Sequence, residues 1–106
     1  MVELSKVTLS LESSIKEAMA LIDESSLRIA LVIDSANYLI GTITDGDIRR
    51  GLLKGLRITD SIDTIIFRTP TVCNINDNRE KILALSLKNN IQQVPVVDNN
   101  GKLVGL

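Results

Sequence analysis

The residues with the clearest chemical potential are a threonine and two aspartates within four positions, Thr44-Asp45-Gly46-Asp47. They follow an apolar segment predicted as a strand and precede a short predicted helix, Ile48–Leu53. A turn from strand to helix places the Thr44 hydroxyl and the Asp47 carboxylate at one edge, beside backbone N–H groups that the helix leaves free. A carboxylate there can accept hydrogen bonds from the vicinal hydroxyls of a ribose, as in dinucleotide sites. The competing interpretation is that Asp45 or Asp47 only caps the helix, which contributes about 0.5–2 kcal/mol.

Three arginines add positive charge near these residues. Arg28 stands just before an apolar strand, where its planar guanidinium could bind a phosphate or lie solvated on the surface. Arg49 and Arg50 could bind a phosphate or an acidic partner, and we favour a solvated helix face for the pair. Asp45 and Asp47 alone make a poor Mg²⁺ site without substrate phosphates, so no metal site is predicted.

The composition excludes several classes of function. The chain has 106 residues, a net charge of −1, no His, one Cys and two aromatic residues. Zinc ligation and His-based acid–base catalysis are therefore excluded within this chain, and neither nucleic acid nor a membrane is an expected partner. Cys73 lies in an apolar alternation and is predicted to be a buried thiol, which suits a cytoplasmic location. A binding function is favoured over catalysis.

The chain contains an internal repeat at an offset of 64 positions, which places residues 7–42 on residues 71–106 without a gap. Val32-Ile33-Asp34 then meets Val96-Val97-Asp98, and identical residues fall at a strand end, a turn and the glycine of the next strand. Duplication explains this better than two similar hairpins that arise independently. Repeated units bury their apolar faces against each other.

Each unit follows the pattern β-α-β-β-α, with the last helix expected only in the first unit. Equivalent apolar strands are predicted at 29–33 and 94–97, and helices at 13–24 and 77–88. Ser14 with Glu17, and Asp77 with Glu80, have the spacing of a capping box. The polar stretch 57–63 bridges the units.

The segment Gly41-Thr42-Ile43-Thr44-Asp45-Gly46-Asp47-Ile48, preceded by Ala30–Asp34, resembles the core of a cystathionine-β-synthase (CBS) domain. Val94-Pro95-Val96-Val97-Asp98 followed by Asn100–Gly105 resembles the same core in a second copy. The resemblance implies an α/β (α+β) fold of tandem CBS repeats with pseudo-twofold symmetry, together forming a Bateman module. We expect repeat 1 at residues 1–56 and repeat 2 at 57–106, the second incomplete at its C-terminal end.

The resemblance also implies a ligand, an adenosine nucleotide such as AMP, ADP or ATP, and no catalytic residue or metal. By this resemblance Thr44 and Asp47 bind the ribose, with Asp45 and Gly46 in the same turn, and Arg28 reaches the phosphates. Asp60 and Ile65 would approach the adenine from the lead-in to the second repeat, although core packing is the commoner role of such an isoleucine.

The variant Thr-Asp-Gly-Asp-Ile-Arg-Arg is familiar from CBS pairs fused to sugar-phosphate enzymes. The resemblance implies a regulatory module fused to such a catalytic domain, a nucleotidyltransferase in preference to an arabinose-5-phosphate isomerase. The module itself is not expected to be an enzyme. The alternative is a ligand-free dimerisation scaffold. In either case we expect a homodimer formed through the two long helices, because apolar surface left on them needs cover.

Overall fold

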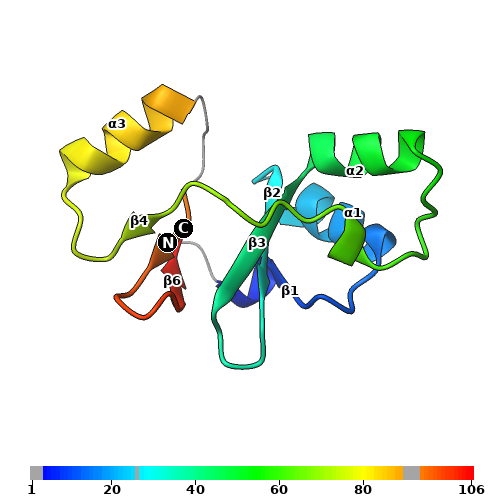
Figure 1. Cartoon of the computed structure of the whole chain (residues 1–106), viewed down its shortest axis with the longest axis horizontal. Helices are drawn as coiled ribbons and strands as arrows, with labels where there is room; N and C mark the ends of the chain where they lie inside the picture. The colour runs from blue at the N-terminus through cyan, green and yellow to red at the C-terminus, as the bar shows by residue number, and fades with distance from the viewer. Residues whose placement is uncertain (1–3, 26, 90–93) are drawn as a thin grey trace.

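The computed structural model describes residues 4–25, 27–89 and 94–106 of the chain. The first unit contains a 3-10 helix (Leu4–Lys6), β1 (Thr8–Leu9), α1 (Ile15–Ser25), β2 (Ile29–Ile33), β3 (Leu39–Thr44) and α2 (Asp45–Leu53). A linker with a 3-10 helix (Ile62–Thr64) leads to the second unit, which contains β4 (Cys73–Asn74), α3 (Arg79–Asn89), β5 (Val96–Val97) and β6 (Leu103–Gly105). Figure 1 shows the second unit on one side of β2 and β3, with α1 and α2 on the other.

The two sheets have the same topology, which confirms the repeated α+β fold. Each has three strands, the first parallel and the third antiparallel to the central one. The offset of 64 holds to the residue, since the pair Val32–Gly41 corresponds to Val96–Gly105 and the register shift that follows recurs in both sheets. The predicted strands at 29–33 and 94–97 are therefore equivalent, although β5 is the shorter.

The hairpin turns repeat the same side-chain chemistry. Asp34 Oδ1 accepts hydrogen bonds from the backbone N–H groups of Ala36 and Tyr38, at 2.9 and 3.0 Å. Asp98 Oδ1 accepts the corresponding pair in the second unit, at 2.8 and 3.0 Å. Asn37 and Gly101 occupy the same position with φ of 71° and 88°, a left-handed conformation that asparagine and glycine adopt most readily.

The central strand β2 has two buried faces, and each builds a different part of the core. On one face Ala30 and Val32 belong to a cluster that α1 and α2 cover; its other buried members are Ile15, Ala18, Ile22, Ile43, Ile48 and Ile62. On the other face Ile29 and Leu31 pack with Leu103 of β6. This explains why β2 is a continuous apolar run rather than an alternating one.

The two units also pair through backbone hydrogen bonds where their hairpins meet. Leu39 N–H donates to the carbonyl of Gly101 at 3.2 Å, and Leu103 N–H donates to that of Asn37 at 2.9 Å. Asn37 Nδ2 adds a bond to the carbonyl of Leu103, at 2.9 Å. The sheets therefore face each other across a short antiparallel contact, as the predicted pseudo-twofold arrangement requires.

The N-terminal caps follow the repeat more faithfully than predicted. Ser14 and Glu17 form the expected reciprocal bonds, at 3.1 and 3.5 Å. The expected box between Asp77 and Glu80 is wrong, because the Lys81 N–H donates to Asn78 Oδ1 at 2.8 Å and α3 begins at Arg79. Asn78 is the residue that the offset of 64 places on Ser14.

The linker crosses the first sheet and fixes its outer edge. Phe67 and Thr42 exchange backbone hydrogen bonds of 2.9 and 3.0 Å, so the linker lies against β3, as Figure 1 shows. The crossing needs Gly41, because a Cβ there would lie 2.4 Å from the Phe67 carbonyl oxygen. The polar stretch 57–63 does bridge the units, and its Asp60 carbonyl accepts a hydrogen bond from the first N–H of α1.

Candidate functional site

The junction of β3 and α2 is closed by Thr44 and Asp47. Thr44 is the N-cap, with extended backbone, and its Oγ1 accepts from the Asp47 N–H at 3.4 Å. Asp47 Oδ2 in turn accepts from the Thr44 N–H at 2.9 Å and from the Thr44 hydroxyl at 3.1 Å. This capping box starts α2 at Asp45, so the predicted start at Ile48 is wrong. Asp47 therefore takes part in the cap of α2, and its other carboxylate oxygen lies outside the box.

That second oxygen carries an ion pair. Arg50 Nη2 lies 2.8 Å from Asp47 Oδ1, one turn further along α2. The Asp47 side chain is 15% exposed and that of Arg50 is 61% exposed, so the arginine lies between a largely buried carboxylate and the solvent. Gly46 leaves room for this arrangement, because a Cβ at that position would lie 3.1 Å from Arg50 Nη1. The prediction of a solvated helix face is correct for the exposure of Arg50, but it did not include the ion pair with Asp47.

Thr44, Asp47 and Arg50 line one cavity of about 280 Å³. Its walls come from four parts of the chain: the first sheet, α2, the linker and the segment before β5. The remaining lining residues are Ile29, Thr42, Phe67, Pro70, Thr71 and Pro95. The cavity thus combines a carboxylate, hydroxyls and one guanidinium on one side with an aromatic ring and two prolines.

Phe67 and Pro95 are members of this cavity that the sequence did not point to as site residues, and for Arg50 the sequence analysis favoured a solvated helix face over phosphate binding. Phe67 is 51% exposed although it is the only phenylalanine, which is unusual for a residue with no surface role. Pro95 takes the place of Leu31 in the repeat, and its position beside the first unit depends on how the sheets meet. Phe67 directly follows Ile65 and Ile66 in the linker, so no change in polarity or spacing distinguished it in the sequence.

Arg28 and Asp45 lie elsewhere. Both line a groove of about 1140 Å³ between α1 and α2, with Met19, Leu53 and other largely aliphatic residues. Arg28 has a left-handed backbone (φ 62°) immediately before β2, and neither residue lines the cavity of Thr44 and Asp47. The residue predicted to bind the phosphates, Arg28, and the residues predicted to bind the ribose, Thr44 and Asp47, therefore line different cavities. The groove is larger, and the described residues of its lining carry two carboxylates (Asp23 and Asp45) and three cations (Lys16, Arg28 and Arg49) but no hydroxyl group.

Asp60 and Ile65 are also separate from the cavity. Asp60 Oδ2 accepts from the Arg57 N–H at 2.7 Å, which fixes the bridge between the units. Ile65 packs on Gly51 of α2 and lines a smaller pocket of about 140 Å³ that also contains Asp47 and Arg50. Only Ile65 approaches the Asp47–Arg50 pair, and it does so beside a different pocket.

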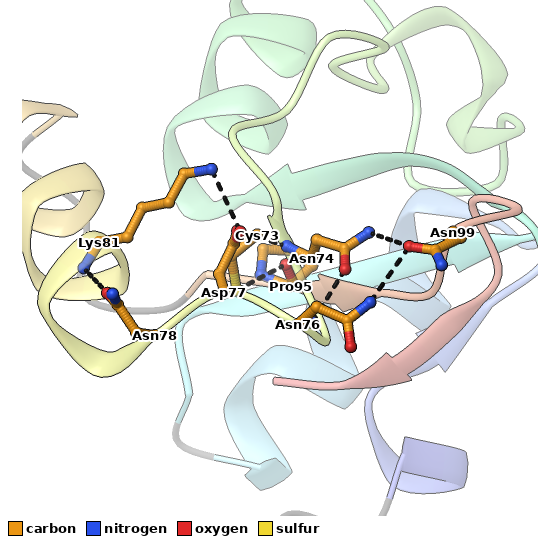
Figure 2. Close-up of polar contacts among 8 residues, drawn as sticks. All are labelled: Cys73, Asn74, Asn76, Asp77, Asn78, Lys81, Pro95 and Asn99. Carbon is orange, nitrogen blue, oxygen red and sulfur yellow. Dashed lines mark hydrogen bonds and ion pairs between the residues drawn. The ribbon is translucent and has the colours of Figure 1, made fainter.

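The second unit has a polar cluster around Cys73, drawn in Figure 2. Asn99 Oδ1 accepts from the Asn74 and Asn76 amides at 3.0 and 3.4 Å, and Asp77 accepts from the Asn74 N–H at 2.7 Å. That bond, followed by Lys81 at 3.1 Å, lowers the pKa of Asp77. Burial, followed by the charge of Asp77, raises the pKa of the Cys73 thiol.

The described ranges contain neither a group of three His, Cys, Asp or Glu side chains able to hold a metal ion nor a helix long and apolar enough to cross a membrane. In the repeat Gln92 takes the place of Arg28, so the sequence argues against a second phosphate site, and Gln92 and Gln93 lie outside the described residues.

A model of the CBS domain matches residues 3–54 and 62–106. The chain belongs to the CBS domain family. The match covers both repeats and agrees with the resemblance of the Gly41–Ile48 and Val94–Gly105 segments.

Among curated proteins, the CBS chain is 34% identical over 97 residues to arabinose 5-phosphate isomerase GutQ of Salmonella typhimurium, covering 90% of this chain and 30% of the relative. It is 30% identical over 96 residues to GutQ of Escherichia coli K12, again covering 91% of this chain and 30% of the relative. The chain thus spans about a third of these isomerases. They do not support the nucleotidyltransferase expected as its host.

Solved structures show the same fold. The CBS domain pair of protein MJ0100, in complex with 5′-methylthioadenosine and S-adenosyl-L-methionine, has a TM-score of 0.80 at 26% identity, over 93% of this chain and 81% of that one. CBS domain protein PAE2072 from Pyrobaculum aerophilum, complexed with AMP, has a TM-score of 0.81 at 22% identity, over 93% and 76% of the two chains. The latter likeness concerns the fold alone.

Proposed function

We propose that this CBS pair is a regulatory module that binds an adenosine nucleotide in the cavity of Thr44, Asp47 and Phe67. The observation that carries the proposal is the position of the Thr44–Asp47 box, whose carboxylate opens into a cavity with an apolar wall. The related CBS pair of MJ0100 is in complex with 5′-methylthioadenosine and S-adenosyl-L-methionine, which supports an adenosine compound as the ligand here.

The chemistry of the lining fits the parts of such a ligand. The Asp47 carboxylate accepts from the ribose hydroxyls, and the box with Thr44 holds it in place. Phe67, Pro70 and Pro95 offer an apolar wall for a purine. A volume of about 280 Å³ is at the lower limit of roughly 300–1,000 Å³ for small-molecule pockets, so the phosphates extend toward the mouth.

We propose that the module regulates a sugar-phosphate isomerase domain in the cytoplasm, since the isomerases above share its sequence over about a third of their length. Without His and with one Cys, the CBS pair supplies little catalytic chemistry of its own. The boundary between its repeats is proposed near residue 56, in the linker that follows α2.

Calorimetry with AMP, ADP and ATP tests the site. We expect a Kd on the order of 10–100 μM for the best of them. Asp47→Ala weakens binding by about one to two orders of magnitude, because charge-assisted hydrogen bonds contribute about 1.5–3 kcal/mol. Asp47→Asn, which keeps an acceptor for the Thr44 N–H, weakens binding without loss of the cap. Asp45→Ala is the matched control and has little effect, since Asp45 faces the other groove. Equal affinity of the unmodified chain and Asp47→Asn removes the site assignment.

The second candidate function is a dimerisation scaffold, and exposed apolar side chains favour it. Met19, Leu53 and Ile58 line the groove between α1 and α2 and are 40%, 81% and 42% exposed. On α3, Leu83 and Leu87 are 53% and 81% exposed. Such surface is typical of protein contacts, and we expect a homodimer by sedimentation, with or without nucleotide. A monomer at high micromolar concentration contradicts this function.

A further inference from the structure

We propose that Arg50 selects a nucleotide over the uncharged nucleoside: its guanidinium pairs with Asp47 in the structure and exchanges this carboxylate for a ligand phosphate on binding. The inference rests on the proposed function and deepens it. Two observations carry it, the ion pair on the oxygen that the ribose needs and the charge distribution of the cavity.

Both carboxylate oxygens of Asp47 already accept hydrogen bonds from protein groups. Oδ2 already accepts two hydrogen bonds from Thr44, at 2.9 and 3.1 Å. Oδ1 accepts from Arg50 Nη2 at 2.8 Å. Two neighbouring ribose hydroxyls need acceptor positions along the outer edge of the carboxylate, so they compete with Arg50 for Oδ1.

The arginine can leave this position at little cost. Its side chain is 61% exposed, and exposed ion pairs of this kind contribute little to stability. Its guanidinium lies over Gly46 in the first turn of α2, and Arg50 belongs to neither of the two hydrophobic clusters of the core. A small swing carries it from Asp47 to the mouth of the same cavity, whose lining it already joins.

A phosphate gives the displaced guanidinium a better partner. Arg50 is the one cation among the described residues that line this cavity, and Asp47 is the one anion. A phosphate that entered beside Asp47 without Arg50 would meet only like charge. Arginine binds phosphate through two parallel N–H groups, a geometry that lysine and neutral side chains lack. Adenosine displaces Arg50 from Asp47 without a new partner for its guanidinium, whereas the phosphate of AMP supplies such a partner.

The test compares AMP with adenosine by calorimetry on the unmodified chain, Arg50→Gln and Arg49→Gln. Arg50→Gln lowers the ratio of AMP affinity to adenosine affinity by about tenfold. Adenosine affinity stays equal or rises, because Asp47 Oδ1 is released. Arg49→Gln, which removes the same charge from the neighbouring position facing the other groove, leaves the ratio unchanged.

The outcomes separate the two proposals. An unchanged ratio in Arg50→Gln, or an equal loss of affinity for both ligands, overturns the role of Arg50 while AMP binding itself stands. Absence of AMP binding to the unmodified chain overturns both proposals. Arg50→Lys retains charge but not the paired N–H groups, and we expect an intermediate ratio.

Discussion

Gly41→Ala tests whether the linker crossing holds the fold and one wall of the cavity together. The new Cβ would lie 2.4 Å from the carbonyl oxygen of Phe67 and 2.7 Å from Cγ1 of Ile66. The first neighbour is backbone, so relief requires the linker to move away and lengthen the two hydrogen bonds between Thr42 and Phe67. Overpacking of this kind costs about 1–3 kcal/mol and each of the two weakened hydrogen bonds about 1 kcal/mol, so the free energy of unfolding falls by about 3–5 kcal/mol.

A thermal melt measures the effect. For a domain of this size 1 kcal/mol corresponds to about 4–8 °C, so the midpoint falls by about 10 °C or more. The repeat provides a matched control in Gly105→Ala, whose Cβ would meet Val96 at an ordinary 3.6 Å. That variant melts within about 3 °C of the unmodified chain. Equal melting of the two variants would refute the claim that the linker crossing requires Gly41.

Three further predictions concern other residues. Arg28 is a non-glycine residue with a left-handed backbone (φ 62°), so Arg28→Gly raises the free energy of unfolding, measured in urea, by about 0.5 kcal/mol. The variant leaves the affinity for AMP unchanged, and a fall in that affinity would show that Arg28 contributes to the nucleotide site. Burial raises the pKa of Cys73, so iodoacetamide labels the native chain at pH 8 at least about tenfold more slowly than the chain in urea; equal rates contradict its burial. Hydrogen bonding from Asn74, then Lys81, lowers the pKa of Asp77, so its stabilising effect is present above pH about 3.9 and is lost as the pH falls through the lower folded value. Asp77→Asn therefore flattens the fall of the unfolding free energy below about pH 4, and an unchanged slope in acid urea titrations contradicts this.

The repeated strands and turns were predictable because their causes are local. The apolar run 29–33 is flanked by a helix and a turn, and Asp34 builds that turn from hydrogen bonds within four residues. The same pattern recurs 64 positions later around Asp98. Helix starts were predicted less well, since Asp77 and Asn78 both have side chains that can cap and the spacing of the residues does not decide between them. Asp77 turns back to Asn74, which leaves the cap to Asn78.

The candidate site was predicted only in part, for a different reason. Thr44 and Asp47 lie three residues apart, so their positions at the junction of β3 and α2 could be predicted from the local sequence. Phe67 and Pro95 reach the same cavity because the linker crosses β3 and the two sheets face each other. Neither event leaves a periodic or spacing signal. Arg28 lines the groove between α1 and α2, and no local pattern in the sequence indicates which of the two surfaces its side chain reaches.

Changes in backbone amide NMR chemical shifts on addition of AMP test the central claim most directly. They report whether AMP occupies the cavity of Thr44 and Asp47 or the groove between α1 and α2. The account predicts saturable shifts at Thr44, Asp47 and Phe67, which line the smaller cavity, with little change at Met19 and Leu53 in the groove between α1 and α2. Shifts confined to Met19 and Leu53, or no saturable shift at all, would contradict it.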